Sequence, residues 1–285
     1  MIEDIRSTII AALNEDIGKG DITTGATIPD HVLGKGILLV KDEGIIAGLD
    51  VAEEVFKTVD RGLVFLRSLK DGNMVKNGDI VAIVEGSAAS ILTAERTALN
   101  FMQRMSGIAT MAFQFRDKVK HTKAKIIDTR KTVPGLRLID KLAVKIGGCE
   151  NHRIGLYDMF LIKDNHIAVA GSIMKAVKAC RDYREIKSIN FLIEVETTNL
   201  LEVAEALQSG ADIIMLDNFE LGEMAKAVSL IKGKCKVEAS GGVNFYTIKN
   251  IAETGVDFIS VGALTHSVKA LDISLEVELS WIHAR

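Results

Sequence analysis

Apolar residues in the first ninety positions of the chain follow two patterns, a helical spacing in some segments and short continuous runs in others. Isoleucine and leucine recur every three to four positions over residues 4–14, which predicts a helix. A second helix is expected over residues 51–59. Short apolar runs between polar turns predict β-strands at residues 36–40, 44–48, 63–69 and 80–86. We expect the first two runs to pair with each other, and this part of the chain to form a small sandwich.

A long helical pattern begins near Thr93 and passes Gly107, a residue that predicts the end of one helix and the start of another. We place the boundary between two domains here, with residues 1–106 in the first and residues 107–269 in the second. Residues 270–285 are predicted to form a helix that packs back on the first domain.

The rest of the chain alternates regularly between strand and helix patterns. Strands are predicted at residues 125–129, 159–164, 191–196, 212–217, 236–240 and 257–262. Helices are predicted between them, at residues 137–146, 172–183, 199–209, 220–232 and 246–254. The last four strand ends are 21, 23 and 22 residues apart, which indicates a parallel β/α barrel. A doubly wound open sheet is the alternative, but the glycine-rich fingerprint that normally follows its first strand does not occur here.

Nearly every predicted barrel strand ends in a polar or charged residue, and active sites of β/α barrels lie at this end of the strands. A basic group lies close together in sequence: Arg130, Lys131, His152, Arg153 and Lys163. In a chain of net charge −3 this group predicts an anionic ligand, since arginine binds carboxylates and phosphates through paired hydrogen bonds. Arg137 and Lys141, on the helix between these segments, are expected to be solvated.

Two acidic residues, Glu196 and Asp217, end adjacent predicted strands. Paired acids beside phosphates hold Mg²⁺ or hydroxyl groups. The alternative is that they only form ion pairs with Arg130 or Lys163.

Glycines follow the last two predicted strands, in Ser240-Gly241-Gly242 and at Gly262. Without a Cβ, these positions allow backbone N–H groups to approach a phosphate. The residues alone therefore predict a barrel enzyme that binds a phosphorylated ligand, a divalent cation and a small anion.

Composition excludes several classes of protein. Hydrophobic residues make up 48% of the chain and charged residues 26%, as in ordinary globular proteins. The net charge of −3 gives no support for nonspecific nucleic-acid binding. No apolar run approaches the ~20 residues of a membrane span. The chain starts without a secretory leader and its three cysteines form no paired motif, so we expect a cytoplasmic protein with reduced thiols.

Other functions fit parts of the pattern. An aldolase-like lyase would form a Schiff base on Lys131 or Lys163. Turns in the first ninety residues resemble those of biotinyl and lipoyl carrier modules, although the carrier lysine is not evident. A carrier would have no use for Glu196 and Asp217. Cys149 is a candidate nucleophile, but such a cysteine is more often a small packed residue.

Eight ordered segments resemble the quinolinate phosphoribosyltransferase family, also known as nicotinate-nucleotide pyrophosphorylase. They are ERTALNFMQRMSGIAT (95–110), DTRKTVPGLR (128–137), GGCENHRIGL (147–156), LIKDNH (161–166), EVE (194–196), MLDN (215–218), EASGG (238–242) and SVGALTHS (260–267). The resemblance implies an N-terminal α/β sandwich domain and a C-terminal open, incomplete β/α barrel. It also implies the reaction of quinolinate with phosphoribosyl pyrophosphate, which requires Mg²⁺ and gives nicotinate mononucleotide, pyrophosphate and CO₂ in NAD biosynthesis.

The resemblance further implies a role for each matching residue. The quinolinate pocket is implied to contain Arg130, His152, Arg153 and Lys163. Arg96 is implied to reach the pocket of a neighbouring subunit, in a homodimer or a multiple of dimers. The catalytic residues around phosphoribosyl pyrophosphate are implied to be Lys131, Glu196 and Asp217, of which the two acids bind the metal. The 5′-phosphate is implied to be bound by Ser240, Gly241 and Gly262.

The sequence departs from the family pattern at Val133 and Cys149, where the family often has Thr and Gly. A related subgroup linked to molybdenum transport shares part of the pattern. An enzyme that uses nicotinate is another alternative, although a single carboxylate needs fewer cations than this sequence offers.

Overall fold

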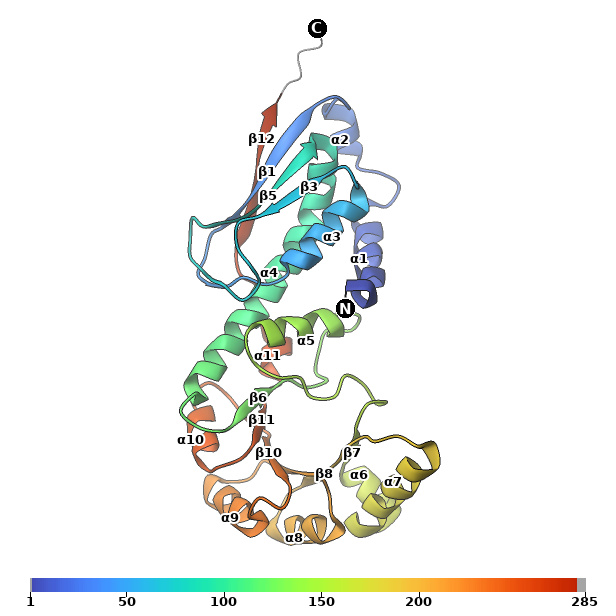
Figure 1. The fold of residues 1–285 in the computed structure, drawn as a ribbon, viewed down its shortest axis with the longest axis vertical. Coiled ribbons are helices and arrows are strands. Elements are labelled where there is room, and N and C mark those ends of the chain that lie inside the picture. The colour runs from blue at the N-terminus through green and yellow to red at the C-terminus, as the bar shows by residue number, and fades with distance from the viewer. Residues whose placement is uncertain (1, 281–285) are drawn as a thin grey trace. The chain divides into compact units, whose positions relative to one another are not determined.

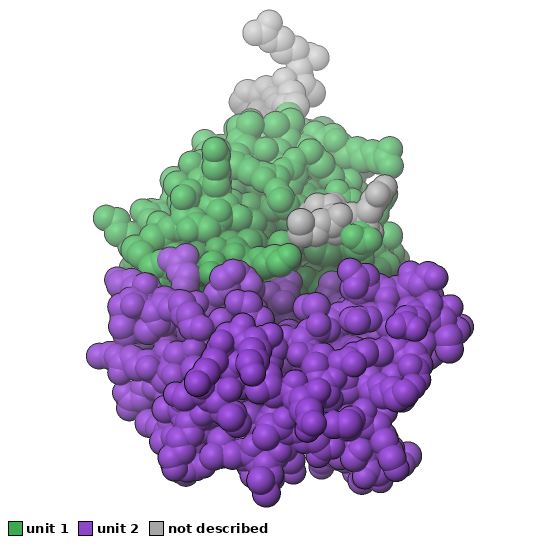
Figure 2. Space-filling model, turned by 60° about the horizontal axis from the view of Figure 1, so that its bottom comes forward, with its two compact units in different colours: residues 1–113, 133–148, 265–285 green, residues 114–132, 149–264 purple. Residues whose placement is uncertain are grey.

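The computed structural model describes residues 2–280, and the chain divides into two compact units, which Figure 2 distinguishes by colour. Unit 1 combines the residues up to 113 with residues 133–148 and the residues from 265 onward. Unit 2 combines residues 114–132 and 149–264. The predicted boundary after residue 106 lies within one continuous helix, α4 (Ala88–Val119). Local sequence patterns could not show that the segment 133–148 belongs with the first unit.

Unit 1 is built on a four-stranded antiparallel sheet. Its strand order is β12 (Ile273–Ser280), β1 (Leu33–Val40), β5 (Ile80–Ser87) and β3 (Val64–Arg67). Alternate residues of β1 are buried, and a Cβ added at Gly36 would come within 3.1 Å of Ile91 in α4. One face of the sheet therefore packs against helix (Figure 1).

The remaining elements of unit 1 are helices and one short ribbon. The helices are α1 (Ile2–Ile17), α2 (Ile22–Thr27), α3 (Leu49–Val59) and α5 (Arg137–Ile146). The ribbon is formed by β2 (Gly44–Ile45) and β4 (Met74–Val75). The predicted pairing of runs 36–40 and 44–48 is thus wrong, because each run finds its partner elsewhere in the chain.

The predicted helix over residues 270–285 is also wrong where the structure describes it. Residues 273–280 form β12, which pairs along its whole length with β1. The sequence ISLEVELS alternates apolar and polar residues, and this period of two is typical of a strand with one buried face. Residues 281–285 of the predicted helix lie outside the described residues.

Gly107 does not end a helix, because α4 continues through it. A Cβ at this position would collide with the backbone carbonyl of Lys269. The glycine therefore permits a close approach between the helix and the chain that leads into β12, and it does not mark a break.

Unit 2 is built on six parallel strands. Their order is β6 (Lys125–Ile127), β11 (Phe258–Ser260), β10 (Lys236–Ser240), β9 (Ile213–Asp217), β8 (Ile193–Thr197) and β7 (Phe160–Ile162). The first and last strands of this order do not pair with each other, so the barrel is open. This confirms the six predicted strands and the fold class of an α/β sandwich followed by an incomplete barrel.

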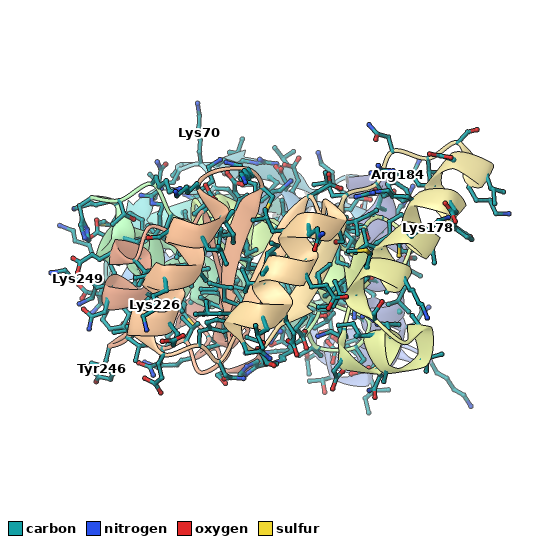
Figure 3. All side chains as sticks on the ribbon, turned by 90° about the horizontal axis from the view of Figure 1, so that it is seen from below. Lys70, Lys178, Arg184, Lys226, Tyr246 and Lys249 are labelled. Carbon is teal, nitrogen blue, oxygen red and sulfur yellow. The ribbon has the colours of Figure 1, made fainter. Side chains whose placement is uncertain are left out.

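Helices follow the strands of unit 2 along the chain. They are α6 (Asp164–Ala170), α7 (Ile173–Lys187), α8 (Leu200–Ser209), α9 (Leu221–Ile231), α10 (Ile248–Glu253) and α11 (Ala263–His266). Helices α7 to α10 lie on the outer side of the curved sheet (Figure 1). Lys178, Lys226 and Lys249 on these helices project away from the sheet (Figure 3). None of the described helices is long and apolar enough to cross a membrane.

Candidate active site

The carboxyl ends of the strands of unit 2 surround a cavity of about 670 Å³. Because all six strands are parallel, their carboxyl ends face the same side of the sheet. Most of the predicted site residues line this cavity, namely Arg130, Lys131, His152, Arg153, Lys163, Glu196, Asp217, Ser240 and Gly241. The structure therefore brings together cations, carboxylates and a glycine-containing turn that are up to 111 residues apart in the sequence.

Polar side chains of the strands form two layers along the cavity. The outer layer consists of Glu196, Asp217 and Ser240, which lie within the last two residues of β8, β9 and β10. The inner layer consists of Glu194 and Glu238, two residues earlier on the same strands, together with His152. Side chains two residues apart in a strand share a face, so both layers point into the barrel.

The outer layer is partly exposed and paired. The carboxylate of Glu196 is 15% exposed and forms an ion pair with the ammonium group of Lys163. This is one of the two pairings that the alternative interpretation of the acids named. The amide of Asn218 donates a hydrogen bond of 2.9 Å to Oδ2 of Asp217. Each carboxylate thus has one oxygen held by a neighbouring side chain.

The turn after β10 has a backbone that requires glycine. Gly241 and Gly242 have φ values of +89° and +60°. A Cβ at Gly241 would collide with the side chain of Asn218, which itself has a φ of +57°. The backbone N–H of Asn218 donates to the carbonyl of Ser240 at 2.9 Å. This hydrogen bond joins the turn after β9 to the turn after β10. The surface that faces the cavity here is therefore mainly backbone, as an anion-binding turn needs.

The inner layer is almost completely buried. Glu194 and Glu238 are 0% and 1% exposed. Burial raises the pKa of Glu194 to about 7, and burial together with the neighbouring Glu194 raises the pKa of Glu238 well above its ordinary value. Nε2 of His152 lies 2.9 Å from Oε2 of Glu194 and 3.5 Å from Oε2 of Glu238.

The inner layer is also the group in the described chain whose spacing suits a metal ion, because one ligand atom from each residue lies within 4.8 Å of the others. However, the backbone N–H of Arg153 donates to Nδ1 of His152 at 2.7 Å. A ring nitrogen that accepts a hydrogen bond carries no proton, so the proton lies on Nε2 and is directed at Glu194. In this arrangement Nε2 is a donor and does not offer a lone pair to a metal.

The cations of the cavity lie close enough to affect one another. Burial and the positive charge of Arg130 lower the pKa of Arg153 from its ordinary value. Arginine nevertheless stays charged at neutral pH. Two guanidinium groups held near each other in a half-buried cavity attract an anionic ligand, which would relieve their repulsion.

Two predicted site residues lie elsewhere. Arg96 is an exposed residue of α4 in unit 1, and Gly262 precedes α11 without lining the cavity. Two other predictions can also be compared with the structure. Lys141 is only 2% exposed, so the expectation that it is solvated is wrong. Cys149 is buried, and burial raises the pKa of its thiol to about 12, which leaves it protonated and unsuited to act as a nucleophile.

Sequence reasoning missed several residues that line the cavity, above all Asn218 and Glu238, as well as Glu194, which contacts the lining residue His152. The signal for Glu194 was present, because it precedes Glu196 by two positions in a predicted strand and must share its face. Asn218 had a weaker signal, since asparagine tolerates the left-handed conformation better than other residues with a side chain.

Comparison with known proteins agrees with this architecture. Residues 21–106 match the model of the quinolinate phosphoribosyl transferase N-terminal domain, and residues 108–276 match that of the C-terminal domain. The chain belongs to the quinolinate phosphoribosyltransferase family. Residues 21–106 are therefore this family's own N-terminal domain and not a separate carrier module.

Named relatives and solved structures cover nearly the whole chain. Quinolinate phosphoribosyltransferase [decarboxylating] 1b from Nicotiana tabacum is 46% identical over 96% of this chain and 83% of its own length. A probable nicotinate-nucleotide pyrophosphorylase [carboxylating] from Bacillus subtilis is 43% identical over 93% of this chain and 91% of its own. The crystal structure of NadC from Streptococcus pyogenes superposes with a TM-score of 0.93 at 40% identity, covering 98% of both chains.

Proposed function

We propose that this protein transfers the phosphoribosyl group of phosphoribosyl pyrophosphate to quinolinate. The products are nicotinate mononucleotide, pyrophosphate and CO₂, and the reaction belongs to NAD biosynthesis. The observation that carries this proposal is the cavity at the carboxyl ends of the unit 2 strands, in which a cluster of cations lies beside two carboxylates and a glycine turn. The family to which the chain belongs supports it independently.

The cations suit an acceptor with two adjacent carboxylates. Arg130, Arg153 and Lys163 line the cavity together, and arginine pairs with a carboxylate through two parallel hydrogen bonds. Nicotinate has one carboxylate and would leave part of this positive charge without a partner. We therefore assign the quinolinate pocket to these three residues and to the adjacent His152.

The donor fits the other side of the cavity. Ser240 and the Gly241-Gly242 turn offer backbone N–H groups for a phosphate, and Lys131 adds a positive charge. We extend this phosphate site to Gly262 by resemblance to the family alone. Glu196 and Asp217 end neighbouring strands and suit the ribose hydroxyls.

Mg²⁺ is the metal we propose for this site. The side chains present fit this ion. Glu196 and Asp217 supply carboxylate oxygens, which are the ligands that Mg²⁺ prefers. Mg²⁺ is usually held by one or two carboxylates together with substrate phosphates. Each carboxylate has one oxygen engaged by Lys163 or Asn218, so the second oxygen of each would bind the ion. When bound, the ion would neutralise charge on the pyrophosphate group.

The chemistry requires positioning and charge stabilisation by the protein. The ring nitrogen forms a bond to the ribose carbon while the bond to pyrophosphate breaks, and the departing oxygen takes the electron pair. Lys131 stabilises this charge, and the cations around quinolinate hold the nitrogen against the reacting carbon. The carboxylate beside the now cationic nitrogen leaves as CO₂, its electron pair stays on the ring carbon, and a proton from water replaces it. No protein nucleophile is needed.

The deciding experiment incubates the purified protein with phosphoribosyl pyrophosphate, Mg²⁺ and either quinolinate or nicotinate. Nicotinate mononucleotide and CO₂ are then quantified. Product from quinolinate, with stoichiometric CO₂, is the expected result. Product from nicotinate alone would contradict the two-carboxylate pocket. Product from neither would indicate a different acceptor, as in the subgroup linked to molybdenum transport, and a borohydride-trapped adduct would favour the Schiff-base lyase.

We also propose a homodimer, or a multiple of dimers, in which Arg96 completes the cavity of a neighbouring subunit. Arg96 is exposed on α4 and is part of the segment that resembles the family. Mixing an Arg96→Ala variant with an Arg153→Ala variant should restore part of the activity, because some mixed dimers would contain one intact site. No recovery, with subunit exchange demonstrated, would contradict sharing. A cytoplasmic location stays a prediction.

A further inference from the structure

The imidazole of His152 is engaged on both of its nitrogens. Nδ1 accepts the backbone N–H of Arg153 at 2.7 Å, and Nε2 lies 2.9 Å from the carboxylate of Glu194. With Nδ1 as an acceptor, the ring is neutral and carries its proton on Nε2. A direct path of hydrogen bonds thus leads from a buried carboxylate of β8 to the backbone of Arg153.

Glu194 is suited to hold the ring because it is buried in an interior strand of the sheet. It is 0% exposed and lies in β8, which pairs with β7 on one side and β9 on the other. Its other oxygen, Oε1, is buried and makes no hydrogen bond within the described residues. The hydrogen bond with His152 therefore links the ring to a buried carboxylate within the sheet, and Glu238 lies close enough to this carboxylate to affect its pKa.

Arg153, in contrast, lies in a segment without helix or strand between residues 151 and 159. Its backbone is held by side chains instead. The N–H of His152 donates to Asp128 at 2.9 Å, and those of Ile154 and Gly155 donate to Asp158 at 2.7 and 2.9 Å. Each backbone N–H from residue 152 to residue 155 is therefore bound by a side-chain acceptor, and for Arg153 that acceptor is the His152 ring.

The far end of Arg153 is also fixed, because Nη1 donates to the carbonyl of Met159 at 3.3 Å. The guanidinium of Arg153 is thus held by the carbonyl of Met159, and the backbone of Arg153 is held by the ring of His152. A shift of the ring would move the start of the side chain, and with it the charge that faces the cavity. Small displacements of such charges have large effects on ligand affinity.

We propose that Glu194 is a positioning residue that acts through the neutral ring of His152 to hold Arg153 in place for the acidic acceptor. His152 then contributes a hydrogen-bonded bridge and no positive charge. The identity of that acceptor as quinolinate rests on the proposed function. The bridge itself depends only on the contacts described above.

The first test is spectroscopic and needs no ligand. Nitrogen NMR of the protein labelled at histidine should show, for His152, one protonated and one unprotonated ring nitrogen, with the proton on Nε2. A His152→Asn variant identifies the signal by its disappearance. A ring with both nitrogens protonated would overturn the proposal, because a charged imidazole cannot accept the N–H of Arg153.

The second test measures binding of quinolinate and of phosphoribosyl pyrophosphate separately by calorimetry. Glu194→Leu removes the acceptor of the Nε2–H, and we expect about a tenfold loss of quinolinate affinity with less than about a twofold change for phosphoribosyl pyrophosphate. Glu194→Gln keeps an acceptor oxygen and can turn its amide toward Glu238. It should therefore recover most of the quinolinate affinity and keep the protonated Nε2 signal.

Glu194→Gln guards against failure of Glu194→Leu to fold, because it keeps the size of the side chain and an acceptor oxygen. His152→Asn serves only to identify the NMR signal, since His152 itself lines the cavity. Equal losses for both ligands, or unchanged quinolinate affinity in a folded Glu194→Leu protein, would contradict the proposal. If the wild type binds no quinolinate, the proposed function fails, while the NMR result still decides whether the bridge exists.

Discussion

The outer and inner layers of the cavity use the same strands but treat their polar groups in opposite ways. Glu196 in the outer layer is partly exposed and paired with a cation, whereas Glu194 in the inner layer is buried and bonded to a neutral ring. A carboxylate near water can exchange partners at little cost, but a buried one cannot. The outer layer is therefore suited to bind ligands, and the inner layer is suited to hold other side chains in place.

Removal of the outer acids should have the largest effect. We expect Glu196→Ala with Asp217→Ala to lower kcat by about a thousandfold or more, because the charge and hydroxyl contacts at the reacting ribose are lost. The measurement is the steady-state rate of nicotinate mononucleotide formation. Asp182→Ala with Glu223→Ala removes two acids from the outer helices and is the matched control. Intact turnover in the cavity variant would show that the outer layer is only a solvated ion-pair surface.

Loss of Arg153 should rank second. Arg153→Ala removes a charged hydrogen-bond donor from the cavity, and we expect quinolinate to bind about thirtyfold more weakly while phosphoribosyl pyrophosphate is little affected. Arg184→Ala, on α7, removes the same type of side chain away from the cavity and serves as the control. Equal losses of both substrates would mean that this arginine does not belong to the acceptor side.

Gly241→Ala should have a smaller but separable effect. The new Cβ would have to tolerate a φ of +89° and would collide with Asn218, so we expect about a tenfold weaker binding of phosphoribosyl pyrophosphate and a lower Tm. Gly233→Ala is the control, because its φ of +74° is equally unfavourable but its Cβ would meet no atom within 4 Å. Identical behaviour of the two variants would reduce the effect to backbone strain alone.

The pH dependence of stability tests the inner layer without any ligand. Burial raises the pKa of Glu194 to about 7, so the folded state binds its proton more tightly than the unfolded state does. The stability that comes from this group is complete below its unfolded pKa and is lost as pH rises to about 7, with a total of a few kcal/mol at most. The melting temperature of Glu194→Gln relative to the wild type should therefore rise between about pH 4.5 and 7 and then level off. A constant difference over this range would contradict the shift.

The sequence allowed the outer layer to be predicted, but of the inner layer only His152. Strand ends are visible because an apolar run stops, so Glu196, Asp217 and Ser240 could be placed at one mouth. Glu194 and Glu238 lie inside such runs, and nothing local shows that a carboxyl there is buried against a histidine. That contact joins a loop to two strands and exists only after the barrel has formed.

The fold shows the same division between local and distant information. The six strands of unit 2 follow from a repeat that each segment carries in itself. The strand at 273–280 has a local mark too, because its apolar and polar residues alternate, although we predicted a helix there. The pairing of β1 with β5 and β12, and the assignment of residues 133–148 to unit 1, depend on contacts between distant segments and leave no local mark.

The position of β12 has a consequence for how the protein is made. Its residues pair with β1 across more than 230 residues of chain, so the sheet of unit 1 cannot be completed until residues 273–280 have left the ribosome. All six strands of the unit 2 sheet, from β6 to β11, leave the ribosome before β12 does. The unit that begins first is thus finished last, and during synthesis β1 exposes an unpaired edge that chaperones would have to shield.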